Sequence, residues 1–119
     1  MRVSIAERRK APRVPVDFPV IYRTIRGEDS AIEEGVNSSK AKDISIYGIG
    51  IRATRRLEEG DLLHVRFYLD DREINGFCSV VWVDMEQGES EYYAGLEFDY
   101  IGETDAIRVI QYMKKKLGM

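Results

Sequence analysis

Two arginines and a later group of polar and small residues have the types and spacing that a ligand-binding site requires. Arg9 and Arg13 form an R-x-x-x-R pattern, and Asp43, Ser45 and Gly48 form a D-x-S-x-x-G pattern about thirty residues further along. The planar guanidinium of arginine donates to phosphate oxygens and to the O6 and N7 acceptors of guanine. A carboxylate accepts instead, so it suits the N1–H and N2–H donors of guanine. The two patterns together favour a ligand that carries both guanine and phosphate.

Proline restricts the segment that carries the two arginines. Pro12 disfavours a helical conformation at Ala11, so we expect Arg9 and Arg13 to lie on an extended or turning segment and to contact a compact ligand from two sides. Each pattern also has an ordinary alternative. A basic arm can be a solvated, disordered start of a chain, and D-x-S-x-x-G can be only a turn between strands. The occurrence of both patterns in this order on a β-patterned chain favours the binding site.

Charge is unevenly distributed along the chain. The 119 residues carry a net charge of −3, yet residues 1–13 carry +4, so the rest of the chain carries −7. Nucleic-acid binding usually needs a broad basic face, which an acidic body does not supply. A small anion needs only a local group of cations, and the N-terminal arm supplies one. We therefore expect a small anionic ligand rather than single-stranded nucleic acid.

The composition disfavours several classes of protein. No apolar run approaches the ~20 residues of a membrane span, and no apolar signal region is visible near the N-terminus. Cys78 is the one cysteine, so neither a disulfide nor a cysteine zinc site can form within one chain. These features predict a single domain with a real core, located in the cytoplasm.

No group of residues indicates catalysis. His64 is the only histidine, and it lies among apolar residues in a strand-like run, where packing or surface exposure explains it better than catalysis. No serine or cysteine has the partners that nucleophilic catalysis needs, and no phosphate-binding or dinucleotide-binding glycine motif is present. The spacing of Gly48 and Gly50 is interpreted as marking the start of a strand and not as a nucleotide-binding motif. We therefore expect a protein that is not an enzyme and holds neither a metal nor a cofactor.

Alternation of apolar and polar residues predicts a mainly β protein. Segments of this kind, separated by turns, indicate a small six-stranded antiparallel barrel. In the segment 73–83 the alternation puts Cys78, Val80 and Trp82 on the same face. The polar segment 27–39 is predicted to be a mobile loop between strands. The strands are expected over residues 14–26, 40–46, 48–54, 62–69, 73–83 and 92–100.

After residue 100 the period changes, which predicts an amphipathic C-terminal helix. Thr104 could cap its start, and the helix is expected to run to about Leu117. The lysine run 114–116 falls in its last turn, where cations interact favourably with the helix dipole, so these lysines are interpreted as structural. The apolar face is predicted from residues that recur at three- to four-residue steps: Ile107, Ile110, Met113 or Lys114, and Leu117.

The chain resembles the PilZ domains, bacterial receptors for cyclic di-GMP, from about Arg8 to Leu117. Its two patterns match the R-x-x-x-R and D-x-S-x-x-G motifs of that family at every motif position. The segments 80–83 and 93–98 look like the family's final strand pair, and the terminal helix is where the family has one. The segment 27–39 is a departure, because the minimal family pattern does not need so long a loop.

The resemblance implies a six-stranded antiparallel β-barrel with a helix across one end. It divides the chain into a basic N-terminal arm, residues 1–13, which is flexible without ligand, and a barrel with its helix, residues 14–119. It implies that Arg9 and Arg13 contact guanine and phosphate, while the second motif lines the barrel surface and contacts guanine and backbone phosphate. The function implied is a non-catalytic receptor that signals to a protein partner or a fused domain. The alternative is a PilZ-like interaction module that does not bind nucleotide.

Arg8 bears on the number of ligands. In the family, an arginine just before the first motif arginine accompanies two stacked cyclic di-GMP molecules, so the resemblance implies two molecules here. Stacking brings phosphates of both molecules together, and their repulsion requires additional cations. In an extended segment Arg8 points away from Arg9, so it could reach the second molecule. The alternative is that Arg8 is merely solvated.

Overall fold

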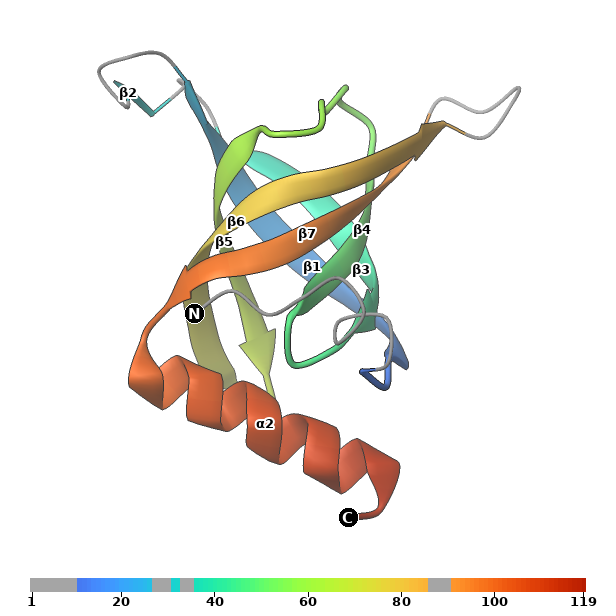
Figure 1. Ribbon diagram of the computed structural model, residues 1–119, viewed down its shortest axis with the longest axis vertical. Coiled ribbons are helices and arrows are strands. Elements are labelled where there is room, and N and C mark those ends of the chain that lie inside the picture. Colours follow the sequence, from blue (N-terminus) through green and yellow to red (C-terminus); the bar gives the residue numbers. More distant parts are fainter. Residues whose placement is uncertain (1–10, 27–30, 33–35, 86–90) are drawn as a thin grey trace.

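The computed structural model describes residues 11–26, 31–32, 36–85 and 91–119 of the chain. The described residues form strands and one helix, named as in Figure 1. These are β1 (Val14–Arg26), β2 (Ala31–Ile32), β3 (Asn37–Ile44), β4 (Gly48–Ala53), β5 (Leu62–Leu69), β6 (Arg72–Met85), β7 (Tyr92–Ile101) and α2 (Glu103–Leu117).

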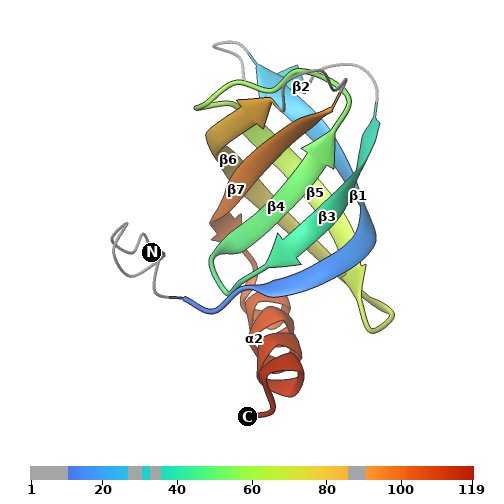
Figure 2. The ribbon, with the colours of Figure 1, turned by 90° about the vertical axis from the view of Figure 1, so that its right-hand side faces the viewer.

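Six long strands close into an antiparallel barrel. They follow the order β1-β3-β4-β7-β6-β5, and β5 pairs again with β1, so the sheet has no free edge among these strands. Figure 2 shows β7, β4, β3 and β1 side by side on one wall. β2 pairs only with the end of β1 and adds nothing to the closure. The prediction of a six-stranded antiparallel barrel with a C-terminal helix is confirmed.

The barrel interior is the hydrophobic core. Inward positions alternate along the strands as the sequence predicted, because successive side chains of a strand point to opposite faces. Phe67 is buried, with its ring centroid 5.4 Å from that of Phe18 and 6.4 Å from that of Phe98. The largest fully buried side chains are those of Tyr22, Phe67, Ile44, Ile49, Ile51, Leu63, Ile74, Val20, Val65, Val80 and Val109.

The prediction of a loop over 27–39 is wrong at its C-terminal end. Asn37, Ser38 and Ser39 belong to β3 and pair with Tyr22, Ile21 and Val20 of β1. These polar residues have low strand propensity, but pairing with a long neighbouring strand satisfies their backbone groups and overrides it. The two residues of β2 were also expected to be loop. Residues 27–30 and 33–35 lie outside the described part of the chain.

A β-bulge in β6 turns Trp82 to the outside of the barrel. The register between β6 and β7 shifts between Val80 and Trp82, so two residues of β6 oppose one step of β7. The expectation that Cys78, Val80 and Trp82 share one face is therefore wrong for Trp82. Cys78 and Val80 are buried, whereas Trp82 is 38% exposed and Val83 packs against the core in its place.

Helix α2 begins two residues earlier than expected. It starts at Glu103, and Gly102 is its N-cap residue with no side-chain hydrogen bond, so the predicted cap at Thr104 is wrong. The acidic Glu103 and Asp105 lie in the first turn, where negative charge interacts favourably with the helix dipole. The last turn carries Lys114, Lys115 and Lys116, at the position that the sequence predicted.

The predicted apolar face of α2 is confirmed at Met113 and wrong at its other positions. The helix packs below the barrel against β1, β5 and β6 (Figure 1) and buries Val109 and Met113. Ile107, Ile110 and Leu117 are 39–47% exposed. Valine and methionine four residues apart lie on one side of a helix, and this pair rather than the isoleucines meets the barrel end.

The docking of α2 gives a first prediction. Met113→Ala should lower the free energy of unfolding by about 2–5 kcal/mol, because a buried methionine leaves a cavity when truncated. Ile110→Ala, on the exposed side of the same helix, is the matched control and should change stability much less. Urea denaturation measures both. Equal losses in the two variants would contradict the burial pattern.

Candidate ligand-binding site

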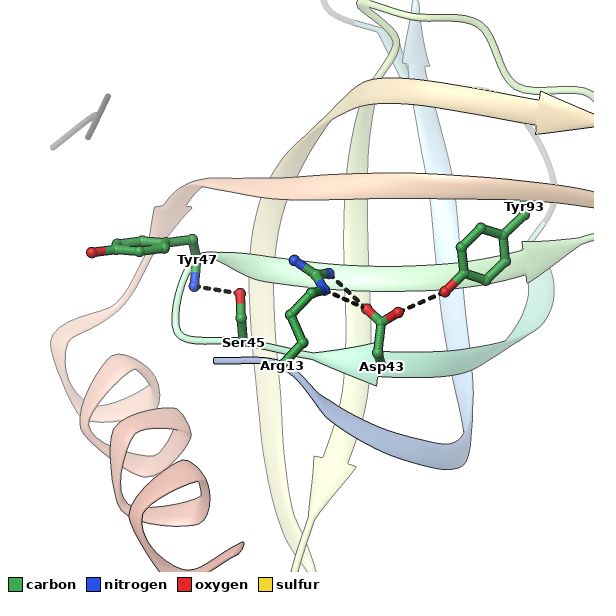
Figure 3. A network of polar contacts seen from close by, with 5 residues as sticks. All are labelled: Arg13, Asp43, Ser45, Tyr47 and Tyr93. Atoms are coloured by element: carbon green, nitrogen blue, oxygen red, sulfur yellow. Dashed lines mark hydrogen bonds and ion pairs between the residues drawn. The ribbon is translucent and has the colours of Figure 1, made fainter. Parts of the chain in front are cut away.

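The two sequence patterns meet in space through an ion pair between Arg13 and Asp43 (Figure 3). Arg13 donates from Nε and from Nη2 to the same carboxylate oxygen, Oδ1 of Asp43, over 2.9 and 2.6 Å. The cause is strand pairing, since Val14 lies opposite Ile44 and Pro15 lies opposite Asp43. The start of β1 is thereby held beside the end of β3. This joins the second arginine of the first pattern to the aspartate of the second.

Tyr93 is the second partner of the Asp43 carboxylate. Its hydroxyl donates to Oδ2 over 2.6 Å, from β7 and across the intervening strand β4 (Figure 3). The pKa of the Tyr93 phenol is raised to about 12, first by burial and then by the hydrogen bond to Asp43 and the charge of Asp43, while Arg13 and Arg52 lower it in part. Sequence analysis gave Tyr93 a place on the final strand but no role at the site.

Gly50 makes room for this contact. It pairs with Asp43 on one side and with Gly95 on the other. A Cβ atom at Gly50 would lie 2.8 Å from Asp43 Oδ1 and 3.1 Å from both Asp43 Oδ2 and the Tyr93 hydroxyl. The interpretation of Gly50 as marking the start of a strand therefore missed its role, although its position two residues after the last motif glycine was a usable signal.

Ser45 and Gly48 build the turn beside Asp43. The Ser45 hydroxyl is buried and accepts a hydrogen bond from the Tyr47 backbone N–H over 3.1 Å (Figure 3), while the Ser45 N–H donates to the Gly48 carbonyl over 2.9 Å. A side chain at Gly48 would overlap the backbone carbonyl of Leu96 in β7. Ser45 and Gly48 thus shape the turn between the strands, which is the alternative that the sequence analysis gave for this pattern. Asp43 carries the accessible polar group.

Trp82 lies against Tyr93 on the outer wall. The two ring centroids are 5.1 Å apart with an interplanar angle of 35°. The indole lies over Gly95, where a side chain would overlap it. Trp82 reaches this place because of the bulge in β6, which is why the alternation of the sequence did not reveal it. The result is an aromatic surface next to the carboxylate of Asp43.

The remaining predicted residues fall outside this cluster. Arg8 and Arg9 lie outside the described residues. His64 packs on the Phe77 ring at 5.1 Å, as a surface or packing histidine would. Cys78 is buried, and burial raises the pKa of its thiol. Within the described part of the chain, no cluster of histidine, cysteine and carboxylate side chains could hold a metal ion.

The comparison with protein families matches the PilZ domain over residues 7–115. The chain belongs to the PilZ domain family. PilZ domains are non-catalytic receptors of cyclic di-GMP, so the expectation that this chain is not an enzyme is confirmed. No helix among the described residues is long and apolar enough to cross a membrane.

Solved structures with the same fold include several PilZ proteins. The inhibitor of motility MotI/DgrA of Bacillus subtilis superposes with a TM-score of 0.72 at 18% identity, covering 93% of this chain and 52% of that one. The PilZ domain of YcgR from Escherichia coli, solved with c-di-GMP, gives 0.64 at 13% identity, covering 93% and 92%. The MrkH–c-di-GMP complex of K. pneumonia gives 0.58 at 17% identity, covering 92% and 52%.

All three sequence identities are low, so these similarities establish the fold and nothing beyond it. The chain spans about half the length of the MotI/DgrA and MrkH chains and nearly all of the YcgR PilZ domain. No curated protein sequence matches the chain.

The contact between Tyr93 and Asp43 predicts a pH dependence. The phenol pKa is 10.0 when unperturbed and about 12 in the folded protein, so the folded state holds this proton more tightly. The resulting stabilisation is complete below pH 10 and is lost as the pH rises through about 12. Asp43→Asn should lower the pKa of Tyr93 toward 10, as followed by NMR of ¹³Cζ-labelled tyrosine. An unchanged pKa in this variant would show that the two side chains do not interact.

Proposed function

We propose that this PilZ domain binds cyclic di-GMP with Asp43, Arg13 and Arg9, and that Ser45 and Gly48 shape the turn that presents Asp43. The observation that carries the proposal is the contact between Arg13 and Asp43. It brings the guanidinium and the carboxylate that the chemistry of a guanine nucleotide requires to one point on the barrel wall. The family match supports the choice of ligand, and the YcgR PilZ domain and MrkH, which share the fold, were solved with c-di-GMP.

The ion pair between Arg13 and Asp43 is suited to exchange. The Arg13 side chain is 43% exposed and that of Asp43 is 24% exposed. Ion pairs near solvent contribute only about 0–1 kcal/mol, so a ligand can replace this one at small cost. Asp43 then accepts from the N1–H and N2–H of guanine, and Arg13 donates to phosphate or to the guanine acceptors. Before and after the ligand binds, Asp43 has a hydrogen-bond donor as its partner and Arg13 has an acceptor.

Ser45 contributes through the backbone in this mechanism. Its buried hydroxyl already accepts the Tyr47 N–H, so it holds the turn rather than reaching a ligand outside the barrel. The resemblance to the family implied a direct contact from the second motif, and we propose that Asp43 makes it. Substitution of Ser45 should therefore weaken binding by loosening the turn.

Signalling is proposed to work through shape, since PilZ domains are non-catalytic. Because Arg13 connects the preceding residues to β1, a ligand held by Arg13 and Arg9 would fix residues 5–13 against the wall formed by β3, β4 and β7. A protein partner or a fused domain would read the surface created in this way. Amide exchange in residues 5–13 should slow when cyclic di-GMP is added, and unchanged exchange would contradict the proposed output.

Calorimetric titration tests the proposed ligand. The chain should bind cyclic di-GMP but not cyclic di-AMP, GTP or single-stranded oligonucleotides. Arg9→Ala and Arg13→Ala should each weaken binding by tenfold to over a hundredfold, because a hydrogen bond to a charged group is worth about 1.5–3 kcal/mol. Lys114→Ala, on the exposed side of α2, is the control. A folded protein that gives no binding heat with cyclic di-GMP would support the alternative of an interaction module that does not bind nucleotide.

The same titration gives the number of ligands. We propose two stacked molecules per chain, with Arg8 beside Arg9 supplying a cation for the second one. Arg8→Leu should reduce the endpoint from two toward one without abolishing binding. A wild-type endpoint of one molecule would refute the stacking and leave the receptor function standing.

A further inference from the structure

We propose that Tyr93 is a positioning residue that orients the Asp43 carboxylate toward the ligand and thereby makes the site selective for guanine over hypoxanthine. The inference rests on the proposed function, because it concerns the same carboxylate. It adds a residue that belongs to neither sequence motif. The contact between the Tyr93 hydroxyl and Asp43 Oδ2, 2.6 Å long, is the observation from which it starts.

The number of hydrogen bonds that Asp43 can accept shows why its carboxylate needs a second donor besides Arg13. A carboxylate has about four positions at which it can accept hydrogen bonds. Arg13 donates twice to Oδ1, and Tyr93 donates once to Oδ2. A guanine edge that donates from N1–H and N2–H needs one position on each oxygen. Oδ2 can take one of these while it keeps Tyr93, whereas Oδ1 becomes free once Arg13 turns to the ligand.

Tyr93 is then the side chain that keeps the carboxylate plane in place. When Arg13 leaves, nothing else among the hydrogen bonds of the described residues restrains rotation of the Asp43 carboxylate. The phenol is also a suitable holder because it is neutral. It orients the carboxylate without neutralising the charge that attracts the guanine donors. An arginine at this position would compete with the ligand for that charge.

The surroundings of Tyr93 hold it in position. Its ring packs against Trp82, whose indole lies over Gly95, and its hydroxyl lies over Gly50. Register adds to this restraint, since Arg52 of β4 pairs with Tyr93 while Gly50, two residues earlier, pairs with Asp43. Burial and the contact with Asp43 raise the pKa of the phenol to about 12, so the hydroxyl remains a donor throughout the physiological pH range.

Orientation of the carboxylate matters most for the guanine amino group. Hypoxanthine has the N1–H of guanine but lacks the N2 amino group, so it makes one of the two hydrogen bonds to Asp43. A carboxylate that rotates freely can still accept one hydrogen bond, but it makes two parallel bonds only when its plane is fixed. Loss of the Tyr93 hydroxyl should therefore weaken a guanine ligand more than a hypoxanthine ligand.

The test compares Tyr93→Phe with wild type by calorimetric titration of cyclic di-GMP and of cyclic di-IMP, its hypoxanthine analogue. Phenylalanine keeps the packing on Trp82 and removes only the hydroxyl. The affinity for cyclic di-GMP should fall by about threefold to thirtyfold, which is less than the loss of a direct charged hydrogen bond because Tyr93 acts on the ligand only through Asp43. The affinity for cyclic di-IMP should change by less than threefold. The matched control is Tyr100→Phe, at the exposed end of the same strand, which should leave both affinities unchanged.

The outcomes separate this inference from the proposed function. Unchanged cyclic di-GMP binding by Tyr93→Phe, or equal weakening of both ligands, would overturn the positioning role and leave the receptor function intact. A wild-type protein that binds neither ligand would overturn both. Gly50→Ala is a second variant, because its Cβ would press on the carboxylate and the hydroxyl from the other side. In the folded Gly50→Ala protein, retention of full selectivity for cyclic di-GMP would also contradict the inference.

Discussion

The proposed site depends on one carboxylate that must be accessible to a ligand and yet held in a defined orientation. Asp43 meets both conditions because three strands converge on it. β3 carries it, β4 presents a glycine beneath it, and β7 supplies the hydroxyl of Tyr93. The ion pair with Arg13 ties the start of β1 to the same point. Any change in the register of these strands would displace the carboxylate relative to its partners.

Glycines at adjacent points of the sheet make this arrangement possible. Gly48 allows close approach to the backbone of β7, Gly50 leaves space for Asp43 and Tyr93, and Gly95 accommodates the indole of Trp82. A side chain at each of these positions would meet a neighbouring atom rather than solvent. The outer wall at this point is therefore shaped by missing side chains as much as by those present. This explains why a polar cluster can form on a sheet whose opposite face is tightly packed core.

Local patterns in the sequence were sufficient for the barrel but not for every detail of it. Alternation identified the buried positions of most strands, because one face of each strand must enter the core. It gave the wrong side for Trp82, since a bulge shifts the phase and leaves no clear signal in a single sequence. The helix face was misjudged for a related reason. Ile107 and Ile110 are more apolar than much of their surroundings, but the shape of the barrel end selects Val109 and Met113.

The proposed site was predictable where its chemistry lies in the motifs and not where it depends on tertiary contacts. Arg13 and Asp43 were named from their types and spacing, and the structure brings them together. Tyr93 is fifty positions from Asp43 and looks like an ordinary strand tyrosine until the strands are paired. The acidic body and basic arm predict a local group of cations rather than a broad basic face, and this stays a prediction because Arg8 and Arg9 lie outside the described residues.

A crystal structure of the chain with cyclic di-GMP would test the central claim most directly. The account predicts that the guanine edge occupies the Asp43 carboxylate, that Arg13 has moved from Oδ1 to the ligand, and that the Tyr93 hydroxyl remains on Oδ2. A ligand bound elsewhere, with the contact between Arg13 and Asp43 unchanged, would contradict it.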